Sequence, residues 1–94
     1  QPAALNALPD GTSIIAAGMV DGIRMHGTPD NPCATFVLNN LAGQATYAAV
    51  DTVTYDDVFG FLLENHAVAV TGISRRPFKD APPYIQVLQV QPAD

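Results

Sequence analysis

Five stretches of the chain have the apolar and β-branched composition of β-strands, and Gly, Pro, Asn or Asp residues separate most of them. The alternation is clearest in the second stretch, where Ala34, Phe36 and Leu38 fall on one face and the intervening residues on the other. This two-residue period is typical of strands that place one face in a hydrophobic core. The expected strands are residues 12–25, 33–40, 44–53, 67–75 and 84–90.

The first expected strand has two interior glycines, Gly18 and Gly22. Interior glycines in a strand often mark a bulge or a sharp bend. We therefore expect residues 12–25 to form one long, strongly bent strand. Residues 39–43 are rich in Asn and Gly, and they predict a loop that joins the next two strands into a hairpin.

Residues 54–65 have a helical period instead. Thr54 followed by Asp57 resembles a capping box, which predicts a helix that begins at Thr54 and ends near Asn65. Asp56 and Asp57 in the first turn would suit the positive end of the helix dipole. The expected apolar face consists of Tyr55, Val58, Phe61 and Leu62, widened by Phe59 and Leu63.

The expected order of elements is three strands, a helix and two further strands, with a bend in the first strand. This is the element order of the OB-fold barrel. Residues 33–38 (CATFVL) resemble the second strand of single-stranded DNA-binding proteins, in which an A-T-F-x-L run recurs. Residues 61–76 (FLLENHAVAVTGISRR) resemble the end of that family's helix followed by a V-x-V-x-G-x-x-R strand. The resemblance spans about residues 12–90. It implies an all-β fold, a five-stranded OB-fold Greek-key barrel with one α-helix between the third and fourth strands.

The chain differs from that family in two respects. It has no tryptophan, the residue on which those proteins stack bases, and Ile73 stands where they tend to have a basic residue. Residues 83–87 (PYIQV) resemble, more loosely, the last strand of OB-fold subunits of mitochondrial RNA-editing complexes.

The length of 94 residues and 9.9 kDa allows a single domain. We expect residues 1–11 to be a flexible N-terminal arm, 12–91 the OB-fold domain and 92–94 a tail. Four Lys and Arg residues against nine Asp and Glu residues give a net charge of −5. This balance excludes a protein whose whole surface binds phosphates, because such proteins are basic.

The few cations lie in two short windows, one at the end of the first strand and one around the loop between the fourth and fifth strands. In an OB barrel the corresponding loops frame one face, on which these folds bind oligonucleotides. Cations neutralise phosphates, and aromatic rings stack on bases. We therefore predict weak binding of single-stranded DNA or RNA by Arg24, His26, Tyr47, Arg75, Arg76, Phe78 and Lys79, with Tyr84 as a third aromatic platform.

An alternative interpretation is equally open for Arg75 and Arg76, which can be a solvated strand end. In this interpretation Phe78 fills the loop, and Tyr47 is a partly buried residue of the barrel and does not stack on a base. Four apolar residues are expected to point away from the core, and a contiguous apolar patch indicates a protein partner. The chain would then be an interaction module within a multiprotein assembly. In either case we expect a homo-oligomer or other protein subunits, with an interface at Val37, Phe59, Leu63 and Ile73.

No catalytic motif is found in the sequence, so we expect a protein that is not an enzyme and has no cofactor. His26, Cys33 and His66 have no recognised metal-ligand spacing.

A lone cysteine excludes an intramolecular disulfide and fits a reducing, intracellular compartment, with cytoplasm and mitochondrion both open. No apolar run approaches about 20 residues, so no membrane span is expected. Because the chain begins at Gln1, we expect a processed form or an excised domain.

Overall fold

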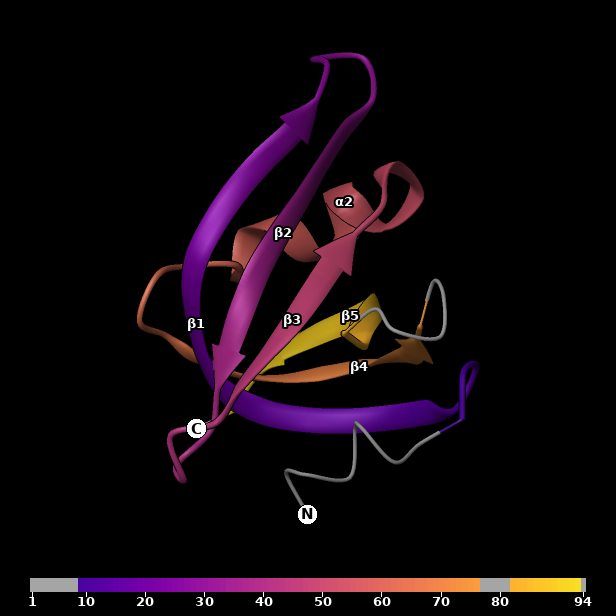
Figure 1. Ribbon diagram of the computed structural model, residues 1–94. Helices are drawn as coiled ribbons and strands as arrows, with labels where there is room; N and C mark the ends of the chain where they lie inside the picture. Colours follow the sequence, from indigo (N-terminus) through magenta and orange to yellow (C-terminus); the bar gives the residue numbers. More distant parts are fainter. Residues whose placement is uncertain (1–8, 77–81, 94) are drawn as a thin grey trace.

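Five strands form a closed barrel in a computed structural model, which describes residues 9–76 and 82–93 (Figure 1). The strand order around the barrel is β1-β2-β3-β5-β4, and every pairing is antiparallel except that of β3 with β5. The expected five-stranded OB-fold barrel is therefore confirmed. The strands are β1 (Ser13–Gly27), β2 (Pro32–Asn39), β3 (Ala45–Val50), β4 (Ala67–Arg75) and β5 (Tyr84–Pro92).

Strand β1 is long and curved, and it pairs with a different neighbour in each half (Figure 1). Residues 13–19 pair with β4, and the part after residue 19 pairs with β2. The register shifts by one residue between Asp21 and Arg24, which is a β-bulge. Gly22 lies in this bulge with φ +62°, a backbone conformation that favours glycine. The bend predicted at Gly22 is confirmed.

The bulge in β1 frees backbone amides from the sheet, and the side chain of Glu64 binds them. Its Oε1 accepts from the Gly22 N–H at 3.1 Å and its Oε2 accepts from the Ile23 N–H at 2.8 Å. A carboxylate between two adjacent amides forms charge-assisted hydrogen bonds, which are stronger than neutral ones. Glu64 therefore fixes the bend that directs the second half of β1 along β2.

Replacing Glu64 by alanine is expected to lower the free energy of unfolding by about 1–2 kcal/mol, because both hydrogen bonds to the bulge are lost. Glu64→Gln should lose less, since it keeps one acceptor. Asp57→Ala is the matched control, because it removes the same charge from a side chain with no hydrogen bond among the described residues. Urea denaturation measures all three, and equal effects of Glu64→Ala and Asp57→Ala would contradict this role of Glu64.

The barrel core is formed by inward-facing side chains of all five strands and by two residues that follow β3. In β2 the buried residues alternate with half-buried ones, as the sequence pattern predicts. Aliphatic and aromatic side chains packed in this way provide the main stabilisation of a small domain. The buried hydrophobic residues are Val20, Ala34, Phe36, Leu38, Ala48, Val50, Val58, Leu62, Val68, Val70, Ile85, Val87 and Val90.

The helix between β3 and β4 is shorter than predicted, and it begins earlier. Helix α2 spans Thr52–Val58, and a 3-10 turn follows at Phe59–Phe61. The predicted capping box at Thr54 is wrong, because the N-cap is Asp51, whose Oδ1 accepts from the Thr54 N–H at 3.0 Å. Asp51 is in extended conformation directly after β3, which is the geometry of an N-cap residue. The Thr54 side chain is buried instead.

Parts of both chain ends lie along the barrel. Of the expected arm, residues 1–8 lie outside the described residues. Gly11 N–H donates to the Ser74 carbonyl at 2.7 Å, and Ser74 N–H donates to the Thr12 carbonyl at 2.8 Å, so the β1–β4 pairing continues beyond the strand. At the other end, β5 extends to Pro92. No helix within residues 9–76 and 82–93 is long and apolar enough to span a membrane.

Candidate nucleic-acid interface

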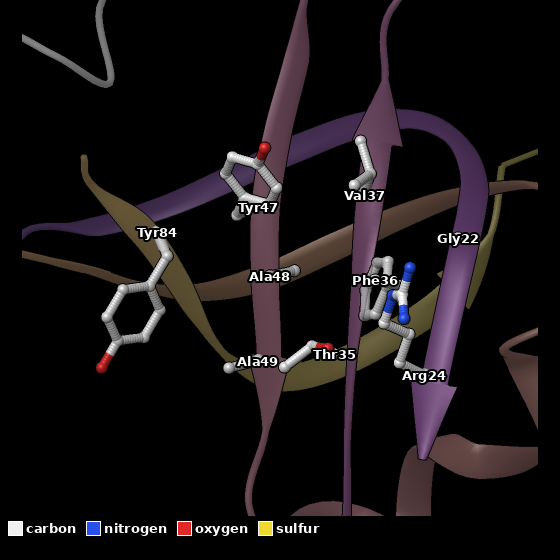
Figure 2. A pocket seen from close by; sticks show the side chains of 9 residues that line it. All are labelled: Gly22, Arg24, Thr35, Phe36, Val37, Tyr47, Ala48, Ala49 and Tyr84. Carbon is white, nitrogen blue, oxygen red and sulfur yellow. The ribbon is translucent and has the colours of Figure 1, made fainter. Parts of the chain in front are cut away.

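A shallow groove of about 360 Å³ crosses the outer surface of β1, β2, β3 and the start of β5. Figure 2 shows Arg24 on one side of it, Tyr47 in the middle and Tyr84 on the far side. Phe36 and Ala48 are buried in the core and form the floor. The full lining is Gly22, Arg24, Thr35, Phe36, Val37, Tyr47, Ala48, Ala49 and Tyr84.

Strand pairing explains how residues distant in sequence meet in this groove. Arg24 pairs with Thr35, and Thr35 pairs in turn with Ala49 on β3. Tyr47 is opposite Tyr84 in the parallel β3–β5 pairing. Neighbouring strands lie about 4.8 Å apart, so the groove extends across three spacings, or about 14 Å, between the backbones of β1 and β5. This length fits a short stretch of extended polymer that crosses the strands.

The groove presents one cation and one aromatic ring to solvent. Arg24 is exposed and has no hydrogen-bond or ion-pair partner among the described residues. The side chain of Tyr47 is 59% exposed. Beside them, His26 Nε2 lies 2.9 Å from the Thr35 hydroxyl, which orients the imidazole toward the wall of the groove. A guanidinium near an exposed ring can contact a phosphate while the ring stacks on the attached base.

Arg75 lies at the β4–β5 end of the groove, where it pairs with Tyr84, and it already has two partners. Its Nε donates to Gln86 Oε1 at 2.8 Å, and its Nη1 lies 3.6 Å from Asp10 Oδ2. The other oxygen of Asp10 accepts from the backbone N–H of Arg76 at 2.8 Å. Asp10 thus partly neutralises Arg75 and reduces the attraction of this end of the groove for phosphate.

The structure brings some of the predicted binding residues together. Arg24 and Tyr47 line the groove, as does Tyr84. His26 lies beside it. Arg75 lies at its end as the last residue of β4, and Arg76 follows directly after the strand, whereas Phe78 and Lys79 lie outside the described residues. The contact between Asp10 and Arg75 was not expected from the sequence, because it joins segments 65 residues apart. Further lining residues that sequence reasoning missed are Gly22, Thr35 and Ala49.

The four apolar residues predicted to contact a partner lie on different parts of the barrel. Val37 lines the groove, and Ile73 is half-buried on β4. Phe59 and Leu63 are about half exposed, at 47% and 50%, beyond helix α2. Phe59 also stacks on Tyr55, with ring centroids 5.0 Å apart. Within residues 9–76 and 82–93, no group of three or more His, Cys, Asp or Glu side chains is placed to bind a metal ion.

The barrel is similar to several solved structures. An OBody, NL8, solved bound to hen egg-white lysozyme, has a TM-score of 0.71 and 17% identity over 89% of this chain and 96% of its own. A small single-stranded DNA-binding protein from Streptomyces coelicolor has a TM-score of 0.64 and 14% identity over 87% of this chain and 92% of its own. A mitochondrial single-stranded DNA-binding protein from S. cerevisiae has a TM-score of 0.70 and 9% identity over 90% of this chain and 98% of its own.

No protein-family model and no curated protein matches the chain. The structural similarity therefore shows the fold, and the fold is that of the OB-fold barrels. The groove lies on the β2–β3 face, where OB folds bind oligonucleotides or oligosaccharides.

Proposed function

We propose that this OB-fold domain binds single-stranded nucleic acid in the groove between Arg24 and Tyr84. The observation that carries the proposal is that one largely apolar groove contains both an exposed arginine, which has no partner among the described residues, and an exposed tyrosine two strands away. A base stacks on Tyr47 and contacts Val37 and Ala49, while Arg24 contacts a neighbouring phosphate. DNA and RNA share this chemistry, since both provide a π-face and a phosphate for each nucleotide.

The proposed binding is weak for this domain alone. The net charge of −5 opposes the approach of a polyanion, and Asp10 occupies Arg75. With four cations in the whole sequence, the salt dependence of binding is shallow. A chain of this kind gains affinity when several copies, or other subunits, bind one strand together.

Two of the similar structures support this proposal, because both are described as single-stranded DNA-binding proteins. In both, the matched barrel covers nearly the full length of the chain.

We also propose that the domain is not an enzyme. Stacking and phosphate contacts suffice for strand binding, and no catalytic motif is found in the sequence.

Arg24→Ala tests the phosphate contact. The variant is expected to bind a labelled single-stranded oligonucleotide roughly tenfold more weakly at low salt, because one charge-assisted contact is lost. The slope of log K against log salt concentration should fall by about 0.7. Fluorescence anisotropy at several salt concentrations measures both quantities. Arg24→Lys keeps the charge and should keep the slope, and an unchanged slope in Arg24→Ala would contradict the contact.

Protein binding is the second candidate function. The OBody solved with lysozyme is an OB-fold chain in complex with a protein. In this chain, Phe59 and Leu63 expose half of their side chains outside the groove. A pull-down with wild type and Leu63→Asp tests this candidate, which requires a partner that wild type retains and the variant loses.

A further inference from the structure

One surface of the barrel, away from the groove, has no charged side chain among its described residues. The outward-facing residues of the first half of β1 lie in register with those of β4, since Ile15 pairs with Thr71, Ala17 with Ala69 and Met19 with Ala67. Ile15 is 76% exposed and Met19 is 44% exposed. We call this surface, together with the hollow described next, the uncharged face.

A hollow of about 500 Å³ continues the uncharged face near the middle of β1, where its first half ends. The loop between β2 and β3 forms its other side, and the side chain of Leu41 in this loop is fully exposed. Leu41 therefore projects from the edge of the hollow without packing against the described part of its own chain. The lining residues are Ala17, Gly18, Met19, Asn39, Asn40, Leu41, Ala42, Ala67 and Ala93.

Charge distinguishes this face from the rest of the described surface. Acidic residues lie on and next to helix α2, Arg24 lies in the groove, and Asp10 and Arg75 meet at the end of β4. Asp21 is at the edge of the hollow, where it accepts from the Asn39 side chain at 3.3 Å. Two copies with a net charge of −5 repel each other, so a contact between them is least unfavourable through a face without charge.

We propose that the uncharged face binds a second copy of this chain, and that Leu41 of each copy enters the hollow of the other. A dimer with twofold symmetry uses the same patch on both subunits, so a projection beside a hollow complements itself. An apolar centre with a charge such as Asp21 at its edge is the usual arrangement in protein interfaces. This proposal does not depend on nucleic-acid binding, because the face is separate from the groove.

The expected dimer is weak. A standard stable interface has about 20–30 residues on each side, and the uncharged face has fewer. We therefore expect association in the range of tens of micromolar. Burial of an exposed leucine removes a large apolar surface from water, so Leu41 is expected to account for a large part of the binding energy.

Sedimentation velocity of the wild-type chain without nucleic acid, from about 1 to 500 µM, tests the proposal. We expect dimer formation across this range, and Leu41→Asp should raise the dissociation constant at least tenfold. Val53→Asp is the matched control, because Val53 is 88% exposed on α2 and the substitution adds the same charge. It should leave the dissociation constant unchanged.

Several outcomes would overturn the proposal. The first is a wild-type chain that remains monomeric at about 500 µM. The second is a dimer that Val53→Asp weakens as much as Leu41→Asp does. A dimer that Leu63→Asp disrupts and Leu41→Asp leaves intact assigns the contact to the surface beyond α2 instead. Circular dichroism verifies that each variant is folded, which is expected because all three side chains are exposed.

Discussion

Gly72→Ala is expected to destabilise the barrel by about 2–3 kcal/mol, and to lower the Tm by roughly 10 °C or more. Gly72 lies in β4, where the register with β5 shifts between Thr71 and Gly72. A Cβ atom at this position would clash with the backbone carbonyl of Gln86, and it would lie 2.6 Å from Ile85 Cγ2. Neither group can move without a shift of β5, because Ile85 is fully buried in the core.

Gly60→Ala is the matched control for this prediction. Gly60 lies in the 3-10 turn after α2, its φ is not positive, and an added Cβ would have no neighbour within 4 Å beyond the local backbone and the adjacent residues. Alanine there should be neutral or stabilise slightly, because it reduces the conformational freedom of the unfolded chain. Thermal denaturation followed by circular dichroism measures both variants. A Tm for Gly72→Ala within 2 °C or so of that for Gly60→Ala would contradict the close approach of β4 to β5.

Tyr47→Ala is expected to weaken the binding of a single-stranded oligonucleotide by roughly 5- to 150-fold. This range corresponds to the loss of one stacked base, about 1–3 kcal/mol. Because the Tyr47 side chain is 59% exposed, its removal should change the stability of the fold little. Anisotropy titration at low salt measures the affinity.

Tyr47→Phe separates stacking from hydrogen bonding. It keeps the ring and loses only the hydroxyl, so its affinity should stay close to that of wild type. If Tyr47→Ala binds as well as wild type while the fold is intact, the base does not stack on Tyr47. If Tyr47→Phe is as weak as Tyr47→Ala, the hydroxyl and not the ring makes the contact.

The strands and the bend of β1 could be predicted from the sequence because they depend on local patterns. The alternation in β2 follows from the pleat, which turns every second side chain toward the core. Gly22 at the bulge was predictable because few other residues adopt a positive φ. The start of α2 could not be predicted from the sequence, since Asp51 and Thr54 are both good N-cap residues. The position at which β3 ends determines which of them acts as the cap.

The candidate site was predictable in part. Arg24 and Tyr47 could be assigned to one face from the order of elements, because the resemblance implied which strands are neighbours. The partners of Arg75 could not, since Asp10 reaches it only through the pairing of the N-terminal segment with β4. The hydrogen bonds of Glu64 to the β1 bulge could not be predicted either, because 42 residues separate Glu64 from Gly22 and only the folded barrel brings them together.

An NMR titration of the labelled chain with an oligothymidine of about 10 nucleotides tests the central claim most directly. The account predicts amide shifts that increase with added oligonucleotide and that concentrate on Gly22, Arg24, Thr35, Tyr47 and Tyr84. It also predicts that the shifts decrease when salt is added. Shifts confined to the surface around Phe59 and Leu63, or no shifts at a millimolar excess of oligonucleotide, would contradict a nucleic-acid interface in this groove.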